Sequence, residues 1–167
     1  MNPSVPAMYK MFYIDGDLKY YTDESMLEGY VVDKQCDYCL SGDYYNQGIG
    51  WDSSGEASTW ALGEETTFFF NVDKVDDEKY VLEIDLDASL SFHRSLYVNG
   101  KHVCEIDEDT EVECWKLDLP SDVLVSGVNK FTILTSEDVL PQSEYFSFTN
   151  DERELNFAVK SVMLQRK

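Results

Sequence analysis

The chain has 167 residues, of which 43% are hydrophobic and 14% aromatic, and its formal net charge is −20. This length and composition predict one folded domain, residues 1–167, around a hydrophobic core. The negative charge excludes nucleic acid and anionic membrane surfaces as favoured partners, since both are bound through Lys and Arg. Acidity of this size favours solubility and identifies no ligand by itself.

The N-terminus and the apolar runs carry no targeting signal. Residues 1–6 contain neither the basic nor the apolar region of a secretory signal peptide. No apolar run approaches the roughly 20 residues of a membrane span, so we expect no membrane insertion. If the chain is complete, these features predict a cytoplasmic protein. If it is part of a longer protein, its compartment stays open.

The first sixty residues predict several short strands. A hairpin is expected around the turn sequence Asp15-Gly16-Asp17. The expected strands are 8–14, 18–21, 30–32 and 36–45, and residues 48–55 are expected to form a loop.

From residue 66 onward the apolar residues alternate with a period of two. Residues 79–87 show it best, with Tyr80, Leu82, Ile84 and Leu86 on one face and mostly acidic side chains on the other. Strands are expected over 66–72, 79–87, 111–119, 130–135 and 155–164, with polar turns at 73–78 and 107–110.

Turn chemistry defines the remaining segments. Asn99-Gly100 lies between two alternating runs and predicts a two-residue type I′ hairpin, because both positions need positive φ. Residues 120–124 predict one short helical turn, and residues 136–153 form a long loop with a cluster of aromatics. Many short strands with almost no helix predict an all-β fold, a two-sheet antiparallel β-sandwich of the jelly-roll kind.

The four cysteines do not form a recognisable site. Cys36 and Cys39 have the spacing of a redox or zinc motif, but no helical pattern follows them. Cys104 and Cys114 lack the close spacing of a zinc knuckle. Reduced thiols are the favoured interpretation, with zinc as the alternative.

No catalytic constellation stands out, so the sequence predicts no enzyme. His93 and His102 flank the Asn-Gly hairpin; two isolated histidines do not indicate a metal centre, and His102 is expected to be a surface or strand residue. Acidic residues number 33, so carboxylate pairs are uninformative, and a small glycan hydrolase or lyase is the weaker alternative. No cofactor is predicted. A structural Ca²⁺ at the acidic turns 15–17, 73–78 and 107–109 is the alternative, and water-exposed turn residues are the favoured interpretation.

A series of short landmarks occurs in an order typical of one family. The landmarks are Gly50-Trp51, Glu56, Thr59-Trp60, Gly63, Val98-Asn99-Gly100, Leu119-Pro120, Gly127-Val128-Asn129 and the run from Asn150 to Leu155. Over residues 48–165 the chain resembles the galactose-binding-like (carbohydrate-binding-module-like) β-sandwich appended to bacterial glycosyltransferases and phosphoglycerol transferases. It departs from that pattern at Asn156, where the family commonly has Gly.

The resemblance implies a non-catalytic carbohydrate-binding or accessory role in bacterial cell-surface glycan assembly. The implied partners are a carbohydrate or a glycosyltransferase-type protein, and relatives often hold a structural Ca²⁺ and bind sugars at loops at one end of the sandwich. The match places Glu56, Trp60, Asp151 and Arg153 as candidates for that end.

Two loop aromatics complete the candidate carbohydrate site. Trp51, in a Gly-flanked loop, is expected to be the more exposed indole, and Tyr145 lies in the long loop. Aromatic faces stack on pyranose rings, while carboxylates and Arg bind hydroxyl groups. The structural alternatives are that Trp60 is a core residue and that Asp151 and Arg153 pair to fix their loop. An acidic protein-interaction domain that docks on a partner is the second functional hypothesis.

Overall fold

The computed structural model describes residues 9–14, 17–22, 29–42, 46–106 and 108–167. Its strands are β1 (Tyr9–Ile14), β2 (Asp17–Thr22), β3 (Tyr30–Val31), β4 (Cys36–Asp37), β5 (Thr59–Leu62), β6 (Glu65–Val72), β7 (Tyr80–Ser89), β8 (Arg94–Val98), β9 (Lys101–Ile106), β10 (Cys114–Leu119), β11 (Gly127–Thr135) and β12 (Leu155–Arg166). Within the described ranges these strands are accompanied by the short helices η3 (Ser121–Val123) and α1 (Gln142–Tyr145).

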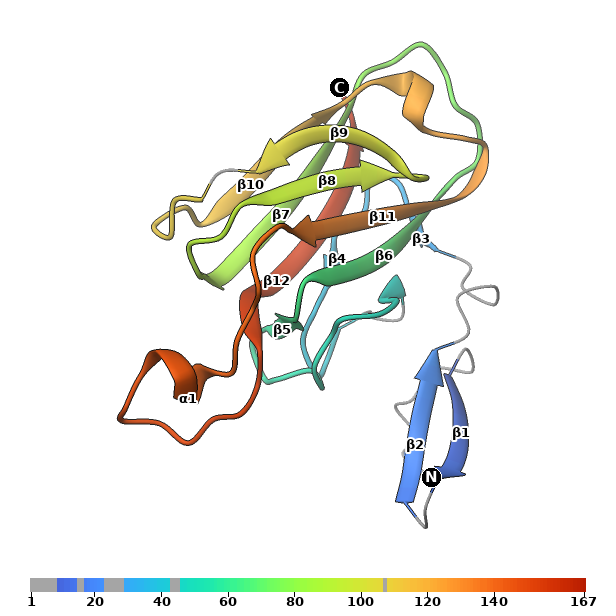
Figure 1. Ribbon diagram of the computed structural model, residues 1–167. Coiled ribbons are helices and arrows are strands. Elements are labelled where there is room, and N and C mark those ends of the chain that lie inside the picture. The colour runs from blue at the N-terminus through green and yellow to red at the C-terminus, as the bar shows by residue number, and fades with distance from the viewer. Residues whose placement is uncertain (1–8, 15–16, 23–28, 43–45, 107) are drawn as a thin grey trace.

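Ten of these strands form two sheets that face each other (Figure 1). Sheet I has the order β3-β6-β11-β8-β9, and sheet II has the order β10-β7-β12-β4, with β5 also paired to β12. Every pair is antiparallel except β3 with β6. The predicted all-β jelly-roll sandwich is therefore confirmed.

The core lies between the sheets and is rich in aromatic rings. In sheet I, Phe68 stacks on Phe131 with ring centroids 5.4 Å apart, and Phe70 meets Phe131 edge-on at 5.5 Å. In sheet II, Trp115 and Phe157 are in edge contact at 5.0 Å. The alternation predicted for residues 79–87 is confirmed, because Tyr80, Leu82, Ile84 and Leu86 are all buried.

The predicted hairpins are also confirmed. Asn99 has φ 51° and Gly100 has φ 80°, as a type I′ turn requires between β8 and β9. The Asn99 amide additionally donates to Val123 O at 3.0 Å, which ties the turn to the predicted helical turn, now η3. At the N-terminus β1 pairs with β2, although the Asp15-Gly16 turn lies outside the described residues.

Four elements differ from the sequence-based expectation. Residues 36–45 do not form one strand: β4 ends at Asp37, and a turn closed by Gly42 N to Cys39 O follows, with residues 43–45 outside the described chain. The strand expected from residue 111 begins at Cys114, since Asp109 accepts from Glu111 N in a turn. The strand β5 and the helix α1 were not predicted. Within the described residues, no helix has the length and apolar composition needed to cross a bilayer.

Candidate functional site

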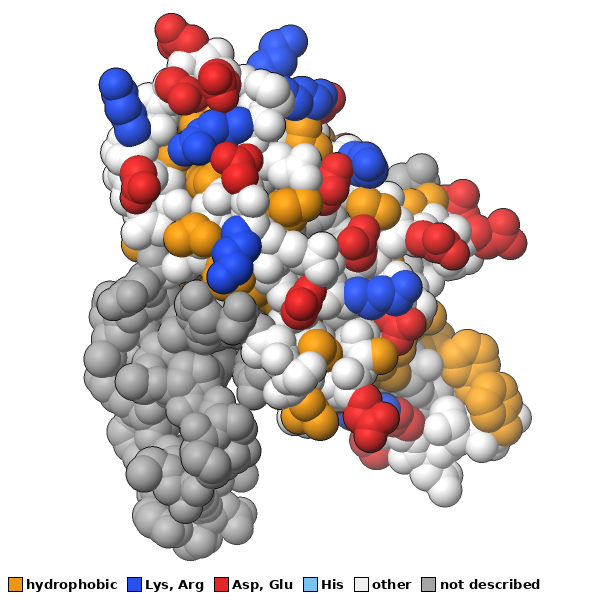
Figure 2. All heavy atoms as spheres, turned by 180° about the vertical axis from the view of Figure 1, so that it is seen from behind, with side chains coloured by type: hydrophobic (Ala, Val, Ile, Leu, Met, Phe, Trp, Pro, Cys, Tyr) orange, Lys and Arg blue, Asp and Glu red, His pale blue; other side chains and the backbone are white. Residues whose placement is uncertain are grey.

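Among the residues whose burial the structure describes, the exposed large aromatic side chains lie in the segment between β11 and β12, residues 136–154, here called the aromatic loop. Phe148 is 85% exposed, and Tyr145 and Phe146 are 42% and 41% exposed. The ring centroid of Phe146 lies 5.2 Å from that of Phe148 and 6.4 Å from that of Tyr145. The loop projects from one end of the sandwich (Figure 1), and Figure 2 shows hydrophobic side chains gathered at that end. Three neighbouring rings therefore face solvent at a loop tip.

Backbone bonds give the aromatic loop a defined shape. Pro141 precedes α1, whose single turn is closed by Phe146 N donating to Gln142 O at 3.0 Å. The helix is fixed to the returning segment by Ser143 N to Asp151 O at 2.9 Å. The Tyr145 hydroxyl accepts from Leu140 N at 3.0 Å, so its phenol oxygen is used within the loop while its ring stays exposed.

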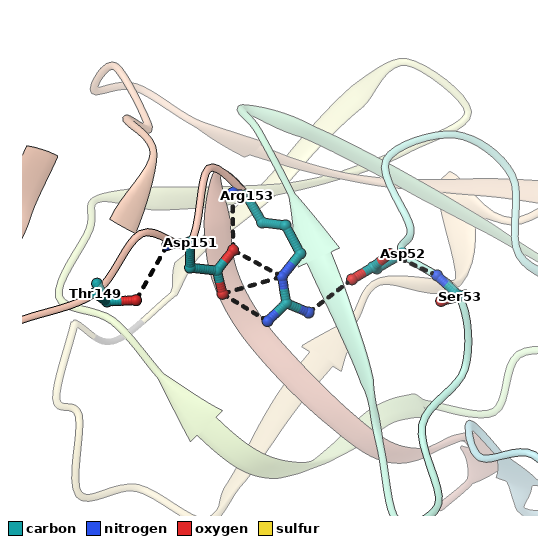
Figure 3. A network of polar contacts seen from close by, with 5 residues as sticks. All are labelled: Asp52, Ser53, Thr149, Asp151 and Arg153. Carbon is teal, nitrogen blue, oxygen red and sulfur yellow. Dashed lines mark hydrogen bonds and ion pairs between the residues drawn. The ribbon is translucent and has the colours of Figure 1, made fainter. Parts of the chain in front are cut away.

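At the base of the aromatic loop, Arg153 joins two carboxylates; Asp52, Asp151 and Arg153 are here called the arginine latch (Figure 3). Arg153 Nη2 donates to Asp151 Oδ2 at 2.6 Å, and Nε donates to Asp151 Oδ1 at 3.0 Å. Its Nη1 donates to Asp52 Oδ2 at 3.0 Å, across 101 residues of sequence. The predicted pairing of Asp151 with Arg153 is confirmed, and the latch also connects the aromatic loop to the loop before β5.

The latch controls the ionisation of its own groups. Hydrogen bonds from the Arg153 side chain and then from its backbone lower the pKa of Asp151 to about 2, and the two carboxylates raise the pKa of Arg153. Asp151 is therefore a carboxylate throughout the range in which proteins normally work.

We expect the latch to survive acidification. A depressed carboxyl pKa means that the ion pair is complete above the ordinary Asp pKa of about 3.9 and is lost only as the pH falls through the folded value. The ¹⁵Nε shift of Arg153, followed by NMR from neutral pH downward, should stay constant to roughly pH 3 and then move. A midpoint near pH 4 would contradict this account, and Asp151→Asn should abolish the step.

Trp51 is more closely packed than its position in a Gly-flanked loop suggested. It is half-buried and packs against the core, with its ring centroid 5.0 Å from Tyr38 and 6.3 Å from Phe157. Its Nε1 donates to Thr67 O at 2.8 Å. Trp51 and Trp60 are both half-buried, so the expectation that Trp51 is the more exposed of the two stays a prediction; the short bridge between Trp51 and Ala61 holds its loop against β5.

Trp60 and Glu56 lie on the segment that leads into β5. Thr59 and Ala61 are fully buried, so Trp60 projects to the outer side of sheet II, half-buried, in one row with Ala158 of β12. Its carbonyl accepts from Asp52 N at 2.9 Å, which places it next to the latch. Glu56 is exposed in a turn closed by Gly55 N to Ser58 O, and within the described residues the carboxylate partners of Arg153 are Asp52 and Asp151.

A buried arginine, Arg94, connects several segments in the interior at this end of the sandwich. Arg94, the first residue of β8, is 1% exposed, and its Nε donates to Asn156 Oδ1 at 2.8 Å. Its Nη2 donates to Leu90 O at 2.5 Å, and its guanidinium lies 5.2 Å from the Trp115 ring and 5.4 Å from the Phe157 ring. Burial lowers the pKa of Arg94 to about 10, so the group still carries its charge at neutral pH.

Asn156 connects Arg94 to the two chain segments that flank the site. Its Nδ2 donates to Thr135 Oγ1 at 2.8 Å and to Gly63 O at 2.9 Å. The side chain thus links the end of β11, the end of β5 and the start of β12. Glycine at this position would have no side chain with which to make these bonds, which gives Asn156 a structural role in this chain.

The four cysteines lie outside the aromatic loop, whereas the backbone of His93 is hydrogen-bonded to the first residues of that loop. None of the four cysteines is in a disulfide, and Cys36 is buried, with its Sγ donating to Asn46 Oδ1 at 3.5 Å. His102 contacts Glu105 at 2.8 Å and His93 contacts Glu108, and both histidines are exposed. Among the residues that the structure describes, no three His, Cys, Asp or Glu side chains are placed to hold a metal ion. The candidate calcium turn at 15–17 is only partly within those residues.

Several residues of the site were not singled out from the sequence. Asp52 was missed because its partner Arg153 is distant in sequence. Phe148 carried a usable signal, since an aromatic run in a Pro-containing polar loop has no strand in which to bury its rings.

Comparisons with known proteins give only remote similarity. No family model matches the chain, and no curated protein matches it. Among solved structures, a family 35 carbohydrate binding module from an environmental isolate is similar at 13% identity, over 81% of this chain and 82% of that chain, with a TM-score of 0.42. CBM35 from Paenibacillus barcinonensis is similar at 13% identity, over 78% and 87%, with a TM-score of 0.38. The site therefore rests on the geometry of this chain alone.

Proposed function

We propose that this protein is a non-catalytic carbohydrate-binding module whose ligand lies against the aromatic loop, beside the arginine latch. The observation that carries the proposal is the cluster of Tyr145, Phe146 and Phe148, three rings within 6.4 Å of their neighbours and facing solvent. Exposed aromatic clusters of this kind are uncommon on a free surface and typical of binding sites.

The chemistry of the cluster suits a sugar chain. The apolar face of a pyranose stacks on an aromatic ring, and adjacent rings at different tilts can follow successive sugar units. Hydroxyl groups at the edge of the sugar find carboxylate acceptors at the latch and in the aromatic loop. Trp60, half-buried next to Asp52, offers a further ring towards the outer side of sheet II.

The ionisation state of Asp151 suits a hydrogen-bond acceptor and not a general acid. A glycosidase general acid needs a carboxyl group whose pKa is raised, so that it is protonated at the working pH. The pKa of Asp151 is instead lowered to about 2 by its hydrogen bonds with Arg153. This carboxylate can accept hydrogen bonds and hold the loop, but it cannot act as a proton donor.

We propose further that the module serves bacterial cell-surface glycan assembly, with a glycosyltransferase-type protein as its partner. The support is the order of short sequence landmarks from Gly50-Trp51 to Leu155. Co-purification of the chain with such an enzyme from the native host, at low and high salt, tests this context separately from sugar binding.

Phe148→Ala is expected to remove glycan binding without affecting the fold. The ring is 85% exposed and contributes little to the core, so the melting temperature should be unchanged. Binding of glycans from a broad panel, measured by array and then by calorimetry, should weaken at least about tenfold, or ~1.4 kcal/mol.

Val125→Ala is the matched control. Val125 is 51% exposed and lies before β11, at the end of that strand opposite to the aromatic loop. The Val125→Ala variant should leave both the glycan affinity and the melting temperature unchanged. A flat response of the unmodified protein across the whole panel, or equal affinities of the two variants, would rule out the proposed site.

A further inference from the structure

The aromatic loop carries a large negative charge, and binding a neutral sugar does not require such a charge. Residues 136–154 contain six acidic residues and one basic residue, a net charge of −5. Of the six, Glu137 accepts from His93 N and Asp151 is held in the latch. The carboxylates of Asp138, Glu144, Glu152 and Glu154 are exposed and have no basic partner among the described residues.

The single basic residue of the loop is already neutralised. Arg153 uses Nε, Nη1 and Nη2 on Asp151 and Asp52. An anionic sugar, such as a uronate or a phosphorylated unit, would meet uncompensated carboxylates and no available cation in this loop. A glycan with protonated amino groups would meet carboxylate acceptors and the faces of aromatic rings, both of which attract cations.

We infer that the preferred ligand is an amine-bearing glycan, a chain of hexosamine units that are not acetylated, and that anionic glycans are rejected. The inference rests on the proposed function and adds the chemical class of the ligand. Charge complementarity selects the occupant, and the three rings make the surface specific for a sugar chain rather than for any cation.

Three hexasaccharides of one linkage type test the inference. They are β-1,4-linked glucosamine, its fully N-acetylated counterpart and β-1,4-linked mannuronate, titrated calorimetrically into the full chain at mildly acidic pH; hexalysine is the non-sugar cation. We expect the glucosamine hexamer to bind about tenfold more tightly than the N-acetylated one, and the mannuronate hexamer and hexalysine to bind much more weakly. The preference should decrease at high salt.

Two double variants distinguish the effect of charge in the aromatic loop from the effect of the overall charge of the protein. Glu144→Gln combined with Glu152→Gln should reduce the ratio of glucosamine to N-acetylglucosamine affinity several-fold. The same loss of charge at the opposite end of β11, by Asp77→Asn with Glu78→Gln, should leave both affinities unchanged, because exposed charges beyond about 10 Å are screened.

The outcomes distinguish this inference from the proposed function. If the mannuronate hexamer binds as tightly as the glucosamine hexamer, the inference is overturned while carbohydrate binding stands. If hexalysine matches the glucosamine hexamer, or if the distal variant changes the ratio as much as the loop variant, general acidity explains the binding and the inference is overturned. If no glycan in this set or in the broad panel binds, the proposed function itself fails.

Discussion

Replacing Arg94 by Met is expected to cost about 3–5 kcal/mol of unfolding free energy, a large part of the stability of an ordinary domain. Met fills similar volume but has no donor, so Leu90 O, Asn156 O and Asn156 Oδ1 would lose the bonds that Arg94 now makes. Buried acceptors without a partner each cost about 1–3 kcal/mol. The attraction between the guanidinium and the Trp115 and Phe157 rings is lost as well.

Urea unfolding followed by tryptophan fluorescence measures this loss. Arg166→Met is the matched control, since Arg166 is exposed and pairs with Asp33 at 3.0 Å on the surface. That variant should lose less than about 1 kcal/mol, as surface ion pairs do. If the two variants have the same unfolding midpoint, then the hydrogen bonds and ring contacts of Arg94 do not hold this end of the sandwich together.

The fold was predictable where short-range pattern determined structure. Tyr80 to Leu86 alternate because one face of β7 is buried, and Asn99-Gly100 adopts the positive φ angles that its turn type requires. The strand β5 was not predictable in this way. It has four residues, and it exists through its pairing with β12, about a hundred residues further along the chain. Pairing at such separation leaves no periodic trace in so short a segment.

The same distinction between short-range pattern and long-range contacts applies to the candidate site. Asp151 and Arg153 are two residues apart, so their pairing could be predicted, and the aromatic run containing Tyr145 was visible in the sequence. The role of Asp52 depends on where the loop before β5 meets the start of β12. The ring contacts of Trp51 were not visible in the sequence for the same reason, because its indole packs on Tyr38 and Phe157 from other segments. Tertiary contacts, and not local composition, decide which aromatic rings remain on the surface.

Gly50→Ala is expected to be the second strongly destabilising change, by about 2–5 kcal/mol. Gly50 has φ +81°, and a Cβ there would lie 2.0 Å from Glu65 O and 3.0 Å from Thr66 Cα. Both atoms belong to the backbone of β6, so no side-chain rotation can relieve the clash. The loop must move away from β6, which also breaks the bond from Leu62 N to Gly50 O.

Gly100→Ala separates steric clash from backbone strain. Gly100 has φ +80°, but an added Cβ would find no atom within 4 Å, so this variant should lose only about 1 kcal/mol. Because Gly50 precedes Asp52, its displacement should also separate Asp52 from Arg153, and the ¹⁵Nε shift of Arg153 should change in Gly50→Ala alone. Equal losses of stability in the two variants would mean that the close approach to β6 is not what fixes this loop. An unchanged Arg153 shift in a destabilised Gly50→Ala would mean that the latch forms independently of the loop before β5.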